Sequence, residues 1–237
     1  MIQIEPVKRL TVTEQIMEQI AQLITNGHLQ PGEQLPNERD LAERFGVTRG
    51  RVREALRALA LIGLITIRAG EGSFVNKQEE PIPPDTIAWM FHREKHNLDE
   101  VYAARQLIET EVYLSAAGQL TDGELASLER SLAHMTASTE LDAEAFLLLL
   151  DEFDLRIGER SDNRIYHKLM QMMIHLRRET SLKLLSVPGA KENSVKQRTA
   201  ILSALASRNK KQLNAALKGL FATSKQFYAD ILNSESD

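Results

Sequence analysis

Residues 37–57 read NERDLAERFGVTRGRVREALR, and this stretch decides the fold of the N-terminal part of the chain. Asn37 can cap a short helix, because its side-chain oxygen can accept a hydrogen bond from a free amide of the first turn. Gly46 can end that helix in a left-handed conformation, and Thr48 can cap a second helix over residues 49–62. Two helices joined by such a tight corner predict a helix-turn-helix, at about residues 38–57.

The segments on either side complete the domain. Residues 11–14 read TVTE, which has the spacing of a capping box, and apolar residues follow at helical spacing until Asn26-Gly27. Residues 64–68 and 72–75 read LITIR and GSFV around a glycine turn, and they read as two short strands, which predicts a two-stranded hairpin. Three helices and a two-stranded wing predict a winged helix-turn-helix domain over residues 1–77.

The chain changes character after this domain. Residues 78–84 read QEEPIPP, and the prolines and charges are typical of a stiff, extended linker. Residues 85–237 predict an all-helical antiparallel bundle, because the connections between helical segments are short. Its seven expected helices cover about residues 85–95, 98–118, 122–138, 141–158, 162–185, 191–206 and 209–234. The fold class is therefore mainly α, with a winged helix-turn-helix followed by a bundle.

Composition narrows the function classes. The 237 residues carry a formal net charge of -4, so any binding of nucleic acid must come from a local cluster of Arg and Lys. No apolar run approaches the ~20 residues of a membrane span, and the N-terminus lacks the pattern of a signal peptide. The absence of cysteine excludes disulfides and thiolate metal sites. We expect a cytoplasmic protein without a membrane partner.

The predicted second helix of the helix-turn-helix carries the local charge. On a helical wheel Arg49, Arg53 and Arg57 form one stripe beside the apolar face, and Arg51 lies at its far edge. Gly50 lies opposite the core and would let the backbone approach a groove closely. A guanidinium can grip guanine or a phosphate with two hydrogen bonds. Such a stripe on an isolated helix is usually a solvated surface, but the capped helix before it and the wing after it favour DNA binding.

At this point the chain resembles the GntR family of regulators. The motifs are LPNERDLA at 35–42, VTR at 47–49, VREAL at 52–56 and RAGEGSFV at 68–75, and the match covers about residues 11–76. The resemblance implies contacts to operator DNA from Arg39 and from Thr48, Arg49 and Arg53, with the glycine wing entering the minor groove. The residues expected to bind DNA are therefore Arg39, Thr48, Arg49, Gly50, Arg51, Arg53, Arg68, Gly70 and Gly72. Glu54 is expected to orient neighbouring arginines.

The C-terminal half resembles the FCD domain of the FadR subgroup. The resemblance rests on Arg105 and Glu109 within residues 98–117, on Phe153 with Asn163, and on AILSAL at 200–205. It implies a homodimer and a cavity inside the bundle for a small-molecule effector. Many members hold a divalent metal there through one Asp and three His, and these positions fall on Leu150, Asp154, Arg198 and Leu220. Because a metal needs at least three converging donors, we expect no metal and no cofactor.

The expected effector site consists of Arg105, Asp154 and Arg198. Arg198 can bind an acid group directly, although it can also neutralise Asp154 in the empty cavity. Arg105 either lines the cavity or is held in an ion pair with Glu109, one turn away. An organic or sugar acid is the leading effector class. An acyl-CoA is the alternative, with its chain near Leu150, Leu220, Met172 and Met173. His92 and His96 have ligand spacing, but as surface residues they need no metal.

Three functions remain to be compared. The leading hypothesis is a transcriptional repressor whose dimer binds a palindromic operator and is released by the effector, although nothing in the sequence fixes the sign of regulation. The second is an enzyme built on the bundle, which lacks support because no phosphate-binding loop or nucleophile motif is present. The third is an effector-independent architectural DNA-binding protein, which the acidic net charge and the large bundle disfavour.

Overall fold

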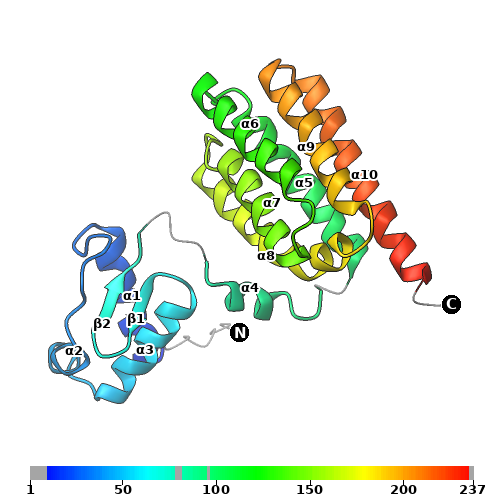
Figure 1. Ribbon diagram of the computed structural model, residues 1–237. Coiled ribbons are helices and arrows are strands. Elements are labelled where there is room, and N and C mark those ends of the chain that lie inside the picture. The colour runs from blue at the N-terminus through cyan, green and yellow to red at the C-terminus, as the bar shows by residue number, and fades with distance from the viewer. Residues whose placement is uncertain (1–9, 78–81, 95–96, 235–237) are drawn as a thin grey trace, which may run out of the picture. The chain divides into compact units, whose positions relative to one another are not determined.

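The computed structural model describes residues 10–77, 82–94 and 97–234. The N-terminal elements are α1 (Val12–Thr25), α2 (Glu38–Phe45), α3 (Arg49–Leu61), β1 (Ile65–Arg68) and β2 (Gly72–Val75). The later helices are α4 (Pro84–Met90), α5 (Leu98–Ala116), α6 (Asp122–Ala137), α7 (Ala143–Gly158), α8 (Arg164–Leu185), α9 (Ala190–Ala206) and α10 (Lys210–Ser234). Contacts divide the chain between Thr86 and Ile87 into two compact units (Figure 1).

The N-terminal unit is a winged helix-turn-helix. Helix α3 packs against α1, α2 and β1, and β1 pairs antiparallel with β2 from Ile65 opposite Val75 to Arg68 opposite Gly72. Its core contains Ile16, Ile20, Val52, Leu59 and Ile65, all at most 2% exposed. Ile16 with Ile20 on α1, and Val52 with Leu59 on α3, lie at helical spacing, so each helix buries one face and leaves the other in solvent, while Ile65 joins the core from β1.

Local signals in the sequence set the ends of these helices. Thr11 and Glu14 form the expected capping box, and the side chain of Asn37 accepts hydrogen bonds from the amides of Arg39 and Asp40. Gly46 ends α2 with a φ of 64°, a conformation that favours glycine. Thr48 does occupy the position before α3, but its side chain makes no capping hydrogen bond, so this detail of the prediction is wrong.

The C-terminal unit is a bundle in which α5 to α10 lie side by side (Figure 1). The tightest neighbours are α9 with α10, α7 with α8, α5 with α8 and α6 with α9. The core contains Tyr113, Phe146, Phe153 and Met170, each at most 1% exposed. Truncating a buried Phe of this kind to Ala costs about 3–5 kcal/mol of folding free energy, so the aromatic side chains of α7 contribute much of the stability of the bundle.

The expected helices of the bundle agree with the structure to within two residues at each end, except the first. The helix expected at 85–95 ends at Met90, and residues 91–94 form turns. Pro84 begins it, as proline favours the first helical position. Of the linker expected at 78–84, residues 78–81 lie outside the described part of the chain, as does His96. None of the helices that the structure describes is both long enough and apolar enough to cross a membrane.

Candidate functional site

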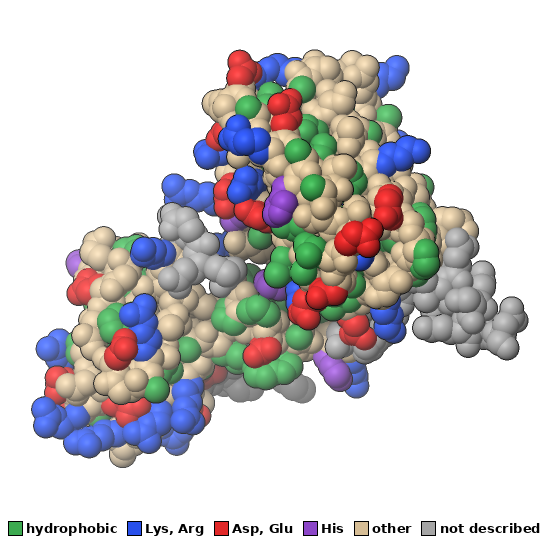
Figure 2. Space-filling model, in the orientation of Figure 1, with side chains coloured by type: hydrophobic (Ala, Val, Ile, Leu, Met, Phe, Trp, Pro, Cys, Tyr) green, Lys and Arg blue, Asp and Glu red, His purple; other side chains and the backbone are tan. Residues whose placement is uncertain are grey.

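The exposed face of α2 and α3 is rich in arginine. Figure 2 shows Lys and Arg side chains gathered over the end of the N-terminal unit where these two helices lie. The side chains of Arg39, Arg51 and Arg53 are 62%, 57% and 54% exposed. Arg49 is exposed as well, and so is Gly50 between Arg49 and Arg51. The fold therefore brings four of the arginines singled out in the sequence onto one solvent-facing surface.

Gly50 leaves this surface open. A Cβ atom added to Gly50 would meet only the hydroxyl oxygen of Thr48, at 3.9 Å. The glycine is thus not required by packing within the protein. The surface at the N-terminal end of α3 therefore carries no side chain at this position.

Arg53 is held in place by a carboxylate on the neighbouring helix. Its Nε donates to both carboxylate oxygens of Glu38, at 2.9 and 3.0 Å, and its Nη2 donates to one of them at 2.5 Å. These hydrogen bonds lower the pKa of Glu38 and raise the pKa of Arg53. The pair was not expected from the sequence, because residues 38 and 53 lie on different helices. Glu54 holds Arg51 as expected, at 3.1 Å, and also accepts from Thr13.

The wing carries Arg68 and a turn that depends on two glycines. Arg68 stacks over the ring of Phe74, with 4.5 Å between the guanidinium carbon and the ring centroid. Gly70 and Gly72 have φ values of 77° and 119°, which side-chain-bearing residues rarely adopt. Gln34 stabilises the turn, because its side-chain amide donates to the carbonyl of Glu71 at 2.6 Å.

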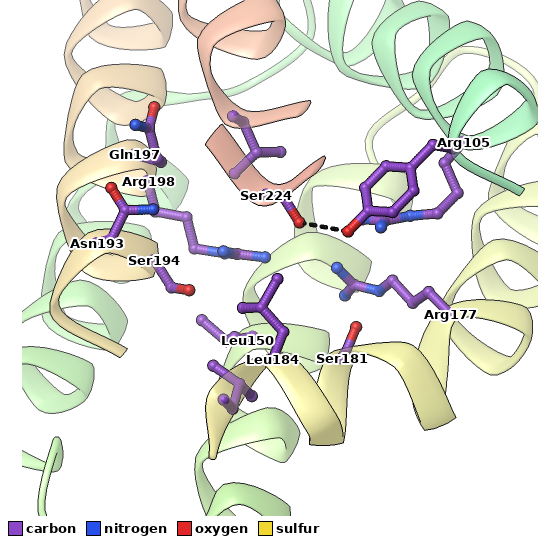
Figure 3. A pocket seen from close by; sticks show the side chains of 13 residues that line it. Arg105, Leu150, Arg177, Ser181, Leu184, Asn193, Ser194, Gln197, Arg198 and Ser224 are labelled. Carbon is purple, nitrogen blue, oxygen red and sulfur yellow. Dashed lines mark hydrogen bonds between the residues drawn. The ribbon is translucent and has the colours of Figure 1, made fainter. Parts of the chain in front are cut away.

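A second candidate site lies inside the bundle, where side chains of α5, α7, α8, α9 and α10 surround a small cavity of about 40 Å³. Arg177 and Arg198 point toward the same space from α8 and α9, and Arg105 lies behind them on α5 (Figure 3). The remaining lining is mixed, with the apolar Tyr102, Leu150, Leu184, Leu185 and Leu220 and the polar Ser181, Asn193, Ser194, Gln197 and Ser224. Met172 and Met173, considered for an apolar effector, do not line it.

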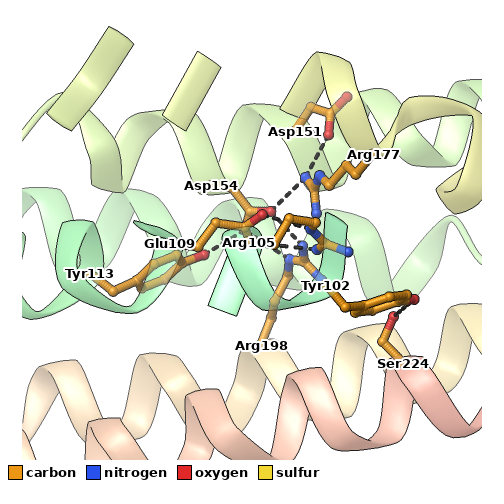
Figure 4. A network of polar contacts seen from close by, with 9 residues as sticks. All are labelled: Tyr102, Arg105, Glu109, Tyr113, Asp151, Asp154, Arg177, Arg198 and Ser224. Atoms are coloured by element: carbon orange, nitrogen blue, oxygen red, sulfur yellow. Dashed lines mark hydrogen bonds and ion pairs between the residues drawn. The ribbon is translucent and has the colours of Figure 1, made fainter. Parts of the chain in front are cut away.

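The cavity borders a buried ionic network (Figure 4). Asp154, 2% exposed, accepts hydrogen bonds from Tyr113 at 2.5 Å, from Arg177 at 2.8 Å and from Arg198 at 2.6 and 3.2 Å. Arg177 also donates to Asp151 at 2.7 Å. The expected pairing of Asp154 with Arg198 is therefore present, whereas Tyr113, Asp151 and Arg177 were not expected from the sequence. Arg105 lines the cavity and is also paired with Glu109, at 2.8 Å, so both of its expected roles are present together.

The two aspartates of α7 differ in their electrostatics. Burial would raise the pKa of Asp154, but the guanidiniums of Arg198 and Arg177 outweigh it and hold that pKa below its ordinary value. Burial raises the pKa of Asp151, and its one partner, Arg177, does not compensate. Burial also opposes a charge on Arg177, yet Asp154 and Asp151 together raise its pKa. Asp154 is thus firmly ionised, and Asp151 is the weakly held acid.

The positions at which related domains hold a metal do converge, but their side chains do not fit one. Leu150, Arg198 and Leu220 all line the cavity, and the single possible donor, Asp154, is already occupied by two guanidiniums and a phenol. Across the described residues, no group of three or more His, Asp or Glu side chains could hold a metal ion.

Comparison with known proteins supports both units. The family model for bacterial regulatory proteins of the gntR family matches residues 12–75, and the FCD domain model matches residues 100–223. The chain is 30% identical over 200 residues to the HTH-type transcriptional regulator LutR of Bacillus subtilis, covering 82% of this chain and 91% of LutR. It is 28% identical over 168 residues to the galactonate operon transcriptional repressor of Escherichia coli, covering 69% of this chain and 71% of that protein.

A solved structure, Streptococcus agalactiae GntR, shares the fold with a TM-score of 0.68 at 22% identity, covering 92% of this chain and 99% of that one. The relatives are transcriptional regulators and not enzymes, and the two domains imply DNA binding and an effector. The chain therefore belongs to the GntR family of bacterial regulatory proteins, as a DNA-binding transcriptional regulator with a C-terminal FCD domain.

Proposed function

We propose that this regulator is a homodimeric repressor that binds a palindromic operator and releases it when a small organic acid occupies the bundle. The observation that carries the proposal is the exposed arginine surface of α2 and α3 on a protein whose net charge is -4. Binding to duplex DNA needs such a local positive surface. A dimer would place two copies of α3 in successive major grooves. Its action on operator DNA makes the cytoplasm its location.

The proposed DNA contacts fall into three groups. Arg49 and Arg53 read base edges or phosphates from α3, and Thr48, Gly50 and Arg51 lie beside them at the same end of the helix. Arg39 binds the phosphate backbone from the start of α2. Arg68, Gly70 and Gly72 form the wing, which enters the minor groove.

The proposed effector is a hydroxylated organic acid, such as a sugar acid. The cavity offers guanidiniums for an acid group and serine and amide side chains for hydroxyl groups. The relative that represses a galactonate operon supports this class by its name. An acyl-CoA is the second candidate, and the five apolar side chains of the lining are what favour it. In both cases the effector lowers operator affinity only if it binds the DNA-free arrangement more tightly.

Selection of duplexes from a random pool tests DNA recognition and yields the operator sequence in the same experiment. We expect the full-length protein to enrich a two-fold symmetric sequence, and Arg49→Ala to weaken binding to it by roughly tenfold to a hundredfold. Arg130→Ala removes an exposed arginine from α6 and serves as the control that keeps full affinity. Enrichment of no sequence, or equal affinity for all three proteins, would contradict the proposal.

The second part of the experiment tests the effector with the operator duplex that the selection yields. Retardation of this duplex is measured with a panel of hydroxylated acids, including galactonate and gluconate, and with acyl-CoA esters. Relief by an acid of the panel supports the first effector class, and relief by an acyl-CoA ester alone replaces it with the second. Retardation that neither set of compounds alters identifies an effector-independent binder.

A further inference from the structure

The network beside the cavity is balanced in charge. Its cations are the guanidiniums of Arg105, Arg177 and Arg198, and its anions are the carboxylates of Glu109, Asp151 and Asp154, all at most 8% exposed. Within the described residues every one of these groups has an oppositely charged partner within 2.8 Å. A ligand that brings a negative charge therefore has to replace an internal anion.

Arg177 lines the cavity, and one of its buried donors has no partner among the described residues. Both of its hydrogen bonds to carboxylates come from Nη2, at 2.7 Å to Asp151 and 2.8 Å to Asp154. Its Nε is buried and has no hydrogen-bond partner in the described part of the chain, although Arg177 is only 3% exposed. Buried donors in folded proteins are almost always paired. The guanidinium edge that carries Nε is consequently suited to donate to an oxygen atom from outside the chain.

The two carboxylates that accept hydrogen bonds from Arg177 differ in how many partners they have. Asp154 accepts from three side chains on three other helices, whereas Asp151 accepts from Arg177 alone among the residues that the structure describes. Burial raises the pKa of Asp151, so the protein stabilises its ionised form poorly. Asp151 is accordingly the carboxylate that an incoming acid displaces at least cost.

A metal ion has no place in this arrangement. Two of the four positions that would bind it in related domains are leucines, one is Arg198, and the fourth is the fully engaged Asp154. A divalent cation there would lie against the guanidiniums of Arg177 and Arg198, and the repulsion between like charges is strong in a buried site.

We propose that the acid group of the effector binds directly to the guanidiniums of Arg177 and Arg198 without a metal ion, and that it takes the place of Asp151 on Arg177. This inference rests on the proposed effector site and adds the mode of binding. Asp151 acts as a built-in competitor, and its carboxylate sets the affinity of the regulator for its acid.

The test uses formate, the smallest carboxylate, because it presents an acid group without the hydroxyl groups that a sugar acid would add. Sodium formate is titrated into full-length protein that has been dialysed against EDTA, and the Nε–Hε signals of the arginines are followed by NMR. Absence of one signal in Arg177→Lys assigns the signal of Arg177. We expect this signal to move and saturate with formate but not with sodium chloride at equal ionic strength.

Asp151→Asn then tests the displacement. The substitution keeps the shape of the side chain and removes the competing charge, so we expect formate to bind about five- to tenfold more tightly. Glu144→Gln is the matched control: it removes one carboxylate from the same helix, at an exposed ion pair with Arg178, and formate affinity should stay at the wild-type value.

Three outcomes would overturn the inference. The Arg177 signal could stay fixed to 200 mM formate in both wild type and Asp151→Asn, formate binding could require added Zn²⁺ or Mn²⁺, or both proteins could bind with equal affinity. Circular dichroism of each variant checks the fold. Operator retardation on the same samples reports the proposed function separately, since formate binding is measured without DNA.

Discussion

Arg53 differs from the other exposed arginines of α3 because Glu38 fixes its guanidinium with three hydrogen bonds. A fixed guanidinium loses less conformational freedom when it meets a base edge, which favours the geometry of one sequence over others. In the proposed complex Glu38 would also place a negative charge near the phosphates, which would lower the affinity for any duplex. We therefore expect the pair to lower general affinity for DNA and to raise discrimination between sequences.

Glu38→Gln tests this at the scale of one residue. We expect binding to a scrambled duplex to become about two- to tenfold tighter, because one repulsive charge is removed. Binding to the selected operator should change less, so the ratio of the two affinities falls. Anisotropy titrations at one salt concentration measure both, and an unchanged ratio would show that Glu38 does not orient Arg53.

Gly50 gives a second prediction at this scale. Gly50→Ala should leave the fold intact and raise stability by up to about 1 kcal/mol, because alanine is the better helix former and space is open. Operator affinity should fall at least tenfold, because the added methyl group meets the groove. Gly123→Ala is a matched control: Gly123 is also the second residue of its helix, with nothing within 4 Å of an added Cβ atom. If both variants bind the operator equally well, Gly50 does not face DNA.

At the scale of elements, the sequence predicted most of the fold because its helix ends are encoded locally. The capping boxes at Thr11 and Thr121 and the left-handed Gly46 act within a few residues, so their spacing can be read directly. The surface arginines of α3 could also be predicted, because their position on the helix follows from local spacing in the sequence. The first helix of the second part was overestimated, because residues 91–94 continue the helical pattern but form turns.

The ionic network could be predicted only in part. Asp154 with Arg198 and Arg105 with Glu109 were considered, yet Arg177 was not. A signal for Arg177 exists, since it follows Met170, Met173 and Ile174 on the buried stripe of α8. An arginine on an apolar stripe indicates a buried partner, but which carboxylate on another helix it meets depends on packing that no local pattern encodes.

The glycine turn of the wing gives a prediction about stability. A Cβ atom added to Gly72 would lie 2.8 Å from Nε2 of Gln34, at a φ of 119°. Gly72→Ala should therefore destabilise the N-terminal unit by about 1–3 kcal/mol. Gly70→Ala adds a Cβ atom in open space at a φ of 77°, and should cost less. Urea unfolding measures the two, and a larger loss in Gly70→Ala would refute the role given to Gln34.

At the scale of the whole molecule, Asp154 links four helices of the C-terminal unit. This one carboxylate on α7 joins Tyr113 of α5, Arg177 of α8 and Arg198 of α9. Removing one partner of a buried ionic network leaves uncompensated charges, which is far more costly than losing a surface ion pair. The stability of the bundle is consequently coupled to the site proposed for the effector.

Asp154→Asn and Asp151→Asn make a pair of identical substitutions three residues apart. Asp154→Asn should cost about 3–5 kcal/mol at pH 7, and Asp151→Asn should stay within about 1 kcal/mol of wild type. The lowered pKa of Asp154 means that its stabilisation is present above the ordinary carboxyl pKa and is lost as the pH falls through the lower folded value. The raised pKa of Asp151 has the opposite effect on the free energy of unfolding. This free energy declines as the pH rises from the ordinary carboxyl pKa through the higher folded value of Asp151.

Thermal unfolding between pH 3 and pH 8 measures how the stability contributions of Asp154 and Asp151 change with pH. The difference between wild type and Asp154→Asn should shrink toward acid pH, because the unfolded wild-type chain takes up a proton at Asp154 before the folded chain does. Equal stability losses for the two variants at pH 7 would contradict the unequal roles assigned to these aspartates.

The leucines at positions 150 and 220 have a consequence for the cell in which this regulator works. A sensor that binds its acid through a metal ion responds both to the concentration of the acid and to the supply of the metal. Under the mode of binding proposed above, which has aliphatic side chains at these two places, transition-metal starvation should leave the response of the regulator to its acid unaltered.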